Sequence, residues 1–165
     1  MARVYVSIGS NIDRDRNIAM ALHLLEASFG RLQRSSVYES AAVGFDSDPF
    51  YNLVVGFDTD DAPHDIQDVL HRIEEASGRI RTTGLSARTL DLDLLLYDDL
   101  VTETDGLKLP RLDIDRYAFV LGPLAEIAGE RRHPLTGERY TDMWSAFHDA
   151  GQVLSRIDWP PATAR

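Results

Sequence analysis

The chain is 165 residues long, which predicts a single domain over residues 1–165 with a full hydrophobic core. Its 27 acidic residues outnumber the 17 basic ones and give a formal net charge of −10, which argues against a broad surface for nucleic acid or an anionic membrane, because both need clustered basic residues. The lack of cysteine excludes disulfides and thiolate metal sites, and Lys108 as the only lysine excludes a Walker A motif.

Strand and helix patterns alternate through the first half of the chain. Residues 3–8 are rich in β-branched residues, and apolar residues at helical spacing follow them. Residues 40–49 have the glycine, aspartate and proline content of a loop. The predicted elements of this half are a strand over 3–8, a helix over 14–29, strands over 31–38 and 50–58, and a helix over 64–77.

The second half begins with a loop and continues into a strongly apolar strand. A small hairpin, a buried helix and a C-terminal helix follow, and the end of the chain is expected to form a loose tail. These elements are predicted over 79–88 (loop), 88–97 (strand), 100–109 (hairpin), 117–127 and 140–150 (helices) and 155–165 (tail).

The order strand, helix, strand, strand, helix, strand predicts an α+β fold. It is the pattern of the ferredoxin-like split β-α-β arrangement, with an antiparallel sheet and helices on one face. The small hairpin and the C-terminal helix are additions to it. The second face of such a sheet is open, and it is expected to form the floor of a cleft under loops 40–49, 79–88 and 110–117.

Polar and apolar residues alternate strictly from Leu90 to Leu94 within the strand over 88–97, so Asp91 and Asp93 project the same way, roughly 6–7 Å apart. Like charges this close repel each other unless they are protonated or neutralised by a cation. Two carboxylates suit Mg²⁺, which fills its other positions with water and phosphates. The alternative is that the pair only decorates the wet side of the strand. One face is predicted to hold Leu90, Leu92, Leu94 and Leu96, and the other Thr89, Asp91, Asp93, Leu95 and Tyr97.

A basic segment precedes the two aspartates in an otherwise acidic chain. Residues 76–90 contain no Asp or Glu, yet they include Arg79, Arg81 and Arg88. Guanidinium groups match phosphate oxygens in pairs. Metal-binding carboxylates beside such arginines are the usual components of phosphoryl transfer, so the two features together favour a functional site over a decorated surface.

Six short motifs occur in a fixed order along the chain. The most specific is Arg-Thr-Leu-Asp-Leu-Asp at 88–93, whereas Gly-Ser-Asn at 9–11 is weak on its own. With these motifs the chain resembles the 6-hydroxymethyl-7,8-dihydropterin pyrophosphokinase family of folate biosynthesis along most of its length. The matching pieces are 8–11, 38–40 with Gly44, 50–52, 73–74 with 78–81, 88–97, and 119–121 with 123–127.

The resemblance implies transfer of pyrophosphate from the co-substrate ATP to the hydroxymethyl group of a reduced pterin, with release of AMP. It also implies that Asp91 and Asp93 hold two Mg²⁺ ions that bridge the triphosphate. The family positions near the phosphates are matched by Arg79, Arg81 and Arg88, and Arg111, which stands where the family has a histidine near the ATP pocket, is expected to contact phosphate as well. The catalytic residues that the resemblance implies are Arg79, Arg88, Asp91 and Asp93.

For the pterin, the resemblance implies an aromatic slot between Phe50 and Phe119. Asn52 matches the amide that reads the pyrimidine edge of the ring. A strand places Phe50 and Asn52 on one face, so stacking and hydrogen bonding come from the same side. The alternative for the two phenylalanines is an ordinary place in the core. Backbone contacts to the ring are implied for Ser40, Ala41 and Val43, and Glu74 is left out of the site.

Three positions depart from the family pattern, all on the nucleotide side. Ser86-Ala87 stands where the family has Gly-Pro, Arg111 replaces a histidine, and Tyr117 replaces an arginine. Such changes alter how a lid loop closes over the nucleotide.

Beside an active diphosphotransferase, two alternatives remain. One is a catalytically weak paralogue that binds pterin or nucleotide as a regulatory module. The other is a ferredoxin-like RNA-binding domain, which the charge of −10 opposes. The expected partners are ATP and a reduced pterin, without nucleic acid or membrane. The N-terminus lacks the features of a signal peptide, so we expect a cytoplasmic protein, and we expect a monomer.

Overall fold

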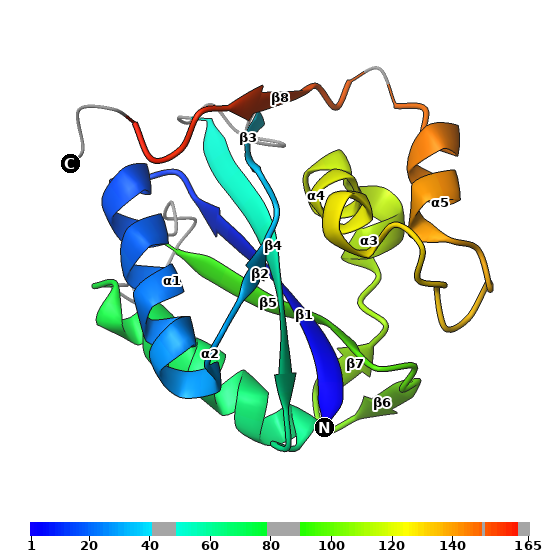
Figure 1. The fold of residues 1–165 in the computed structure, drawn as a ribbon, viewed down its shortest axis with the longest axis horizontal. Coiled ribbons are helices and arrows are strands. Elements are labelled where there is room, and N and C mark those ends of the chain that lie inside the picture. Colours follow the sequence, from blue (N-terminus) through cyan, green and yellow to red (C-terminus); the bar gives the residue numbers. More distant parts are fainter. Residues whose placement is uncertain (41–48, 79–89, 150, 162–165) are drawn as a thin grey trace.

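The computed structural model describes residues 1–40, 49–78, 90–149 and 151–161 (Figure 1). A mixed sheet-and-helix core is followed by a small hairpin and a helical C-terminal part. In chain order the elements are β1 (Ala2–Ser10), α1 (Arg14–Phe29), β2 (Gln33–Arg34), β3 (Val37–Ser40), β4 (Phe50–Thr59), α2 (Pro63–Ala76), β5 (Asp91–Tyr97), β6 (Thr102–Thr104), β7 (Leu107–Leu109), α3 (Asp113–Arg116), α4 (Ala118–Ala128), α5 (Tyr140–Ala146) and β8 (Leu154–Ile157).

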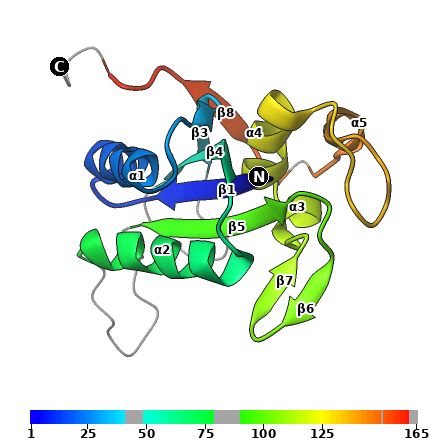
Figure 2. The same cartoon turned by 60° about the horizontal axis from the view of Figure 1, so that its bottom comes forward.

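The main sheet has the strand order β5-β1-β4-β3-β8, and β2 also pairs with β4. Each pairing in it is antiparallel. This order, with α1 after β1 and α2 after β4, confirms the predicted α+β, ferredoxin-like class. Strands β6 and β7 form the separate hairpin that was predicted, which stands away from the main sheet in Figure 2.

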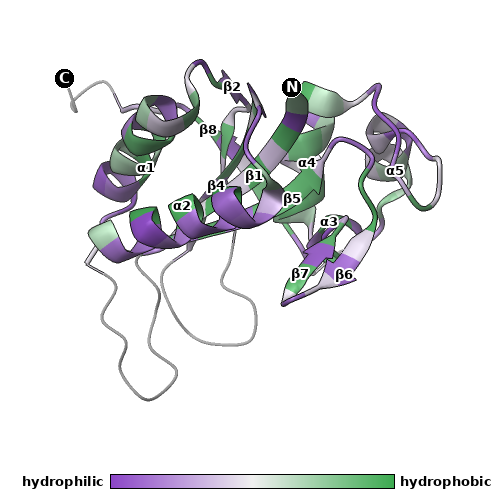
Figure 3. Cartoon of the chain, turned by 90° about the horizontal axis from the view of Figure 1, so that it is seen from below, coloured by the Kyte–Doolittle hydropathy of each residue, from purple (hydrophilic) through white to green (hydrophobic). Residues whose placement is uncertain are grey.

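Helices α1 and α2 cover one face of the sheet, which we call the helix face. Their apolar stripes pack on alternate residues of the strands, so that Ile18 and Leu70 share one buried cluster with Val6, Ile8 and Val55. The amphipathic pattern of each helix explains this placement, because the polar residues of the helix then face water. The purple outer side of α2 in Figure 3 shows that arrangement.

The opposite face, which we call the site face, is partly covered as well. Helix α4 packs on it, and Leu121 and Leu124 share a second buried cluster with Val54 and Leu95. The prediction of helices on one face only is therefore wrong for this part of the sheet. The reason is that α4 is apolar on nearly every side, as its green colour in Figure 3 shows, and such a helix must be buried.

A β-bulge interrupts the predicted alternation of β5. Val6 pairs with Leu94 but Tyr5 pairs with Leu96, so Leu95 is an extra residue in β5. Beyond the bulge the side chains change faces. Leu96 joins the cluster on the site face and Tyr97 packs toward the helix face, opposite to the prediction from strict alternation.

The end of the chain also differs from its prediction. Residues 155–165 were expected to be loose, but Leu154–Ile157 forms β8 and pairs with β3 along the sheet edge. Trp159 then packs on the core beneath α1, so apolar burial holds this segment.

The last helix ends at Ala146, before the predicted residue 150. In the described part of the chain, no helix is long and apolar enough to cross a membrane.

Candidate functional site

Asp91 and Asp93 lie on the site face of β5, before the bulge. Leu92, between them, is buried in the cluster of the helix face, so the two aspartates point the other way. Across β1 they pair with Gly9 and Ser7. Both side chains are partly exposed, so they are accessible from solvent.

Arg111 meets this pair from the segment that follows β7. Its Nη2 lies 3.4 Å from Oδ1 of Asp93, and its Nε lies 3.3 Å from Oδ2 of Asp113. Its backbone N–H donates to the carbonyl of Leu95 at 3.1 Å. This hydrogen bond to the bulge residue of β5 fixes the position of the Arg111 backbone beside the site. The result is a guanidinium group between two carboxylates at the edge of the site.

Glu74 supports the aspartate strand and was missed by the sequence prediction. It lies on α2 with 5% of its side chain exposed, and its Oε2 accepts a hydrogen bond of 2.9 Å from the backbone N–H of Leu92. That N–H stands between the two aspartates along the chain. The sequence did contain a signal for this role. Glu74 continues the apolar stripe of Ile66 and Leu70 at helical spacing, and an acidic residue on a buried stripe needs a hydrogen-bond partner.

Asn52 and Phe50 also lie on the site face, two strands away from the aspartates. Asn52 pairs with Gly9, and its Nδ2 donates to Oγ of Ser40 at 2.7 Å. A Cβ atom on Gly9 would stand 3.0 Å from Oδ1 of Asn52 and 3.8 Å from the ring of Phe50. Glycine at this position therefore keeps the floor beside both side chains clear, and Asp91, Gly9 and Asn52 form one row across β5, β1 and β4.

Phe119 lies near the start of α4, the helix that packs on the site face. Its ring stacks on Tyr117 with centroids 4.9 Å apart and planes 23° apart. Phe119 is partly exposed at the border of the second cluster. The expected aromatic residues are thus on the strand and the helix that flank the same face.

Glu126 ties α4 to the strand that carries Ser40. Its carboxylate accepts hydrogen bonds from the hydroxyl of Tyr38 at 2.7 Å and from the hydroxyl of Ser36 at 2.8 Å, and also from the Ser36 N–H. Burial alone would raise the pKa of Glu126, but these hydrogen bonds outweigh it and lower the pKa. Burial and the bond to Glu126 raise the pKa of Tyr38 to about 12. We call these three residues the Glu126 clamp.

Five of the predicted site residues lie outside the described residues, so their placement stays a prediction. The remaining ones are on or beside the site face. The residues outside are Ala41, Val43, Arg79, Arg81 and Arg88.

The donor set of the aspartate pair fits a hard divalent cation. Within residues 1–40, 49–78, 90–149 and 151–161, no three His, Cys, Asp or Glu side chains gather into a complete metal site. Mg²⁺ does not require one, because it commonly takes one or two carboxylates and fills its remaining positions with water and substrate phosphates. The guanidinium of Arg111 beside Asp93 shows that this carboxylate already has a cation near it.

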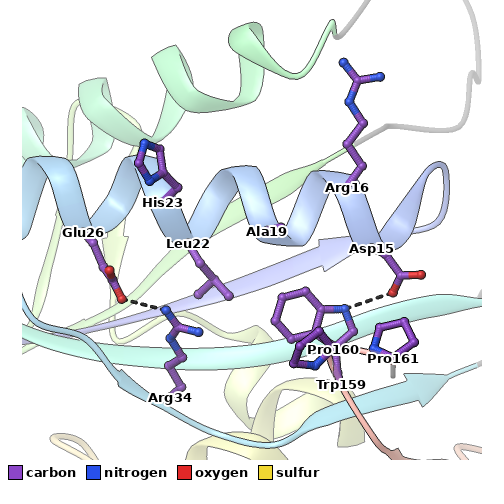
Figure 4. A pocket seen from close by; sticks show the side chains of 10 residues that line it. All are labelled: Asp15, Arg16, Ala19, Leu22, His23, Glu26, Arg34, Trp159, Pro160 and Pro161. Carbon is purple, nitrogen blue, oxygen red and sulfur yellow. Dashed lines mark hydrogen bonds and ion pairs between the residues drawn. The ribbon is translucent and has the colours of Figure 1, made fainter. Parts of the chain in front are cut away.

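A separate cavity of about 520 Å³ lies between α1 and the C-terminal segment (Figure 4). The indole N–H of Trp159 donates to Asp15 at 3.0 Å on one side of it, and Arg34 pairs with Glu26 at 2.7 Å on the other. Because α1 covers the helix face, this cavity is not part of the aspartate site.

Several curated proteins of one kind are similar to this chain. Residues 5–129 match the family model described as 7,8-dihydro-6-hydroxymethylpterin-pyrophosphokinase. A 2-amino-4-hydroxy-6-hydroxymethyldihydropteridine pyrophosphokinase of Pseudomonas aeruginosa is 40% identical over 139 residues, covering 80% of this chain and 84% of that protein. The Haemophilus influenzae protein of the same name is 34% identical over 156 residues, covering 90% and 95%.

Solved structures with a similar fold include those of longer proteins. Plasmodium falciparum HPPK-DHPS with pterin and p-hydroxybenzoate has a TM-score of 0.72 at 15% identity, covering 87% of this chain and 42% of that one. A triple mutant of the same protein with pteroate has a TM-score of 0.68 at 14% identity, covering 87% and 43%. The chain thus spans less than half of these proteins, and at such identity the likeness shows the fold alone.

Proposed function

The chain belongs to the 7,8-dihydro-6-hydroxymethylpterin-pyrophosphokinase family, and on that premise we propose that it transfers pyrophosphate from ATP to the hydroxymethyl group of 6-hydroxymethyl-7,8-dihydropterin in folate biosynthesis. The products are the pterin diphosphate and AMP. The observation that carries this proposal is the row of Asp91, Gly9 and Asn52 across three neighbouring strands. It sets a candidate metal ligand and a candidate pterin-reading amide on one face of the sheet.

Asp91 and Asp93 are proposed to hold two Mg²⁺ ions together with the triphosphate. Bound Mg²⁺ supplies charge neutralisation of the phosphates and polarises the attacking hydroxyl group. The chain's own contribution is to fix the two carboxylates on a strand that Glu74 holds at Leu92. The arginines proposed to bind the phosphates are Arg79, Arg81, Arg88 and Arg111.

The pterin is proposed to bind beside this metal site, between Phe50 on β4 and Phe119 on α4. Asn52 has a fixed orientation, because its Nδ2 donates to Ser40, so its amide oxygen is directed away from that bond toward Gly9. That oxygen is the group expected to accept hydrogen bonds from the pyrimidine edge of the ring. Backbone contacts from residues 40, 41 and 43 complete the proposed slot.

The enzyme is proposed to act as a monomeric single domain in the cytoplasm on small molecules only. The test is an assay that measures AMP and pterin diphosphate together, with and without Mg²⁺. Wild type is compared with Asp91→Asn, Asp93→Asn and the control Asp99→Asn, an exposed aspartate in the turn after the same strand. We expect both site variants to keep their circular dichroism spectrum and to lose activity by orders of magnitude, as loss of metal ligands should cause.

Asp99→Asn is expected to keep full activity. Full activity of either site variant would contradict the assigned roles. Binding of pterin and nucleotide by wild type without AMP formation would instead support a regulatory paralogue.

A further inference from the structure

We propose that Arg111 is an exchangeable counter-cation of the metal site. It neutralises Asp93 while no metal is bound, and it moves to the phosphates when the metal–nucleotide complex arrives. The protein alone then binds divalent ions weakly, and the nucleotide strengthens that binding. This inference rests on the proposed function, because it needs Asp93 to be a metal ligand and a triphosphate to be the incoming anion.

The first argument is the geometry of the two contacts. The distances of 3.4 Å to Asp93 and 3.3 Å to Asp113 are longer than the usual 2.7–2.9 Å, roughly, of a charge-assisted hydrogen bond. The Nε of Arg111 is buried and makes no hydrogen bond to any of the described residues. The guanidinium is thus held by charge more than by aligned hydrogen bonds, and such contacts exchange easily.

The second argument is that the backbone is fixed while the side chain has alternative partners. The N–H of Arg111 is bonded to Leu95 on the edge of β5, so the residue stays beside the site when its side chain moves. Asp113 already contacts the guanidinium and keeps a carboxylate beside it when Asp93 is taken. A triphosphate offers a further anionic partner, because its oxygens match the guanidinium donors in pairs.

The third argument is electrostatic competition for one oxygen. A divalent ion on Asp93 needs the carboxylate that Arg111 now contacts. The ion and the guanidinium would then both lie next to one carboxylate and would repel each other. Metal binding to the protein alone therefore costs the contact between Arg111 and Asp93 and leaves the guanidinium with Asp113 only among the carboxylates it now contacts. When nucleotide is present, its phosphates carry enough negative charge for both the metal and the guanidinium.

The experiment titrates Mn²⁺, read by electron paramagnetic resonance, into wild type, Arg111→Met and Arg111→Lys. The matched control is Arg131→Met, the same change at an exposed arginine that lines a cavity together with Asp98, the residue that follows β5. We expect Arg111→Met to bind Mn²⁺ alone about two- to fivefold more tightly, the range of a partly exposed ion pair. Arg111→Lys keeps the charge and should stay near wild type, as should Arg131→Met.

A second titration adds a non-hydrolysable ATP analogue to each protein with Mn²⁺ present. Here Arg111→Met is expected to bind the analogue more weakly than wild type, because the phosphates lose a guanidinium. Mn²⁺ affinity that is equal or weaker in Arg111→Met overturns the inference, and so does unchanged analogue affinity. If neither wild type nor Arg111→Met binds Mn²⁺, with or without the analogue, the proposed metal site itself fails and the inference falls with it.

Discussion

Removing the carboxylate of Glu74 is expected to loosen the strand that carries both aspartates. In Glu74→Ala the N–H of Leu92 loses its acceptor, and both groups are buried, at 5% and 3% exposure. An unsatisfied buried donor costs about 1–3 kcal/mol, and a bond to a charged group lies toward the upper end. We therefore expect the free energy of unfolding to fall by about 2–3 kcal/mol, since the bond is 2.9 Å long and inaccessible to water.

The measurement is chemical denaturation with a thermal melt beside it. For a chain of this size each kcal/mol lowers Tm by about 2–4 °C, so a fall of about 4–12 °C is expected. Glu74→Gln keeps an amide oxygen for the Leu92 N–H, and it should lose about 1 kcal/mol, the difference between a charged and a neutral acceptor. Asp68→Ala removes an exposed carboxylate from the same helix and should change stability by about 0.5 kcal/mol or less.

The same variants connect stability to the site. If Glu74 fixes the spacing of Asp91 and Asp93, then Mn²⁺ affinity falls in Glu74→Ala and is largely restored in Glu74→Gln. The reasoning is refuted if Glu74→Ala is as stable as Asp68→Ala, because the buried hydrogen bond then contributes nothing. A stable Glu74→Ala protein with normal Mn²⁺ affinity would likewise remove Glu74 from the support of the site.

Three further changes test the site face of the sheet and the helices on that side. Gly9→Ala sets a Cβ 3.0 Å from Oδ1 of Asn52, so pterin affinity in a fluorescence titration should fall several-fold while Tm stays close to wild type. Tyr140→Phe removes a buried hydroxyl that has no hydrogen-bond partner among the described residues, so urea denaturation should show equal stability or a gain of up to about 1 kcal/mol. Glu126→Gln tests the Glu126 clamp. Because the folded-state pKa of Glu126 lies below the ordinary value of 4.5, its stabilising effect is present above pH 4.5 and is lost as the pH falls through the folded pKa. The stability difference between wild type and Glu126→Gln should therefore shrink below pH 4.5, and a constant difference would contradict the assignment.

The sequence was sufficient for the aspartate face but not for the whole strand. Alternation correctly predicts that Asp91 and Asp93 share a side, because Leu90, Leu92 and Leu94 all need the core. It fails at Leu95, because Leu94, Leu95 and Leu96 are all apolar. Such a run does not show which side chain belongs to which face, and nothing in it indicates a bulge. The register is decided by β1, whose Tyr5 and Val6 are on opposite faces, and such a long-range pairing is invisible to a local pattern.

The same limit explains what was missed outside β5. Glu74 acts through a backbone N–H on another element, and a helical pattern cannot say which strand passes beside it. Strand β8 has only Leu154 and Ile157 as apolar members, so its pairing with β3 comes from an available sheet edge and not from its own composition. Elements fixed by their own periodicity, such as α1 and β4, were predicted close to their observed bounds.

The register of the central strands decides whether this sheet can serve both substrates at once. Asp91 and Asn52 are separated by one strand, and neighbouring strands lie about 4.8 Å apart, so their backbones are about 10 Å apart across Gly9. A slip of one residue in either pairing would send one of the two side chains to the helix face, where the α1–α2 core has no room for a polar group. The proposed metal ligand and the proposed pterin-reading amide therefore share one face because Gly9 pairs with both Asp91 and Asn52. A side chain at Gly9 would reduce the clearance beside Asn52 and Phe50, between the two proposed sites.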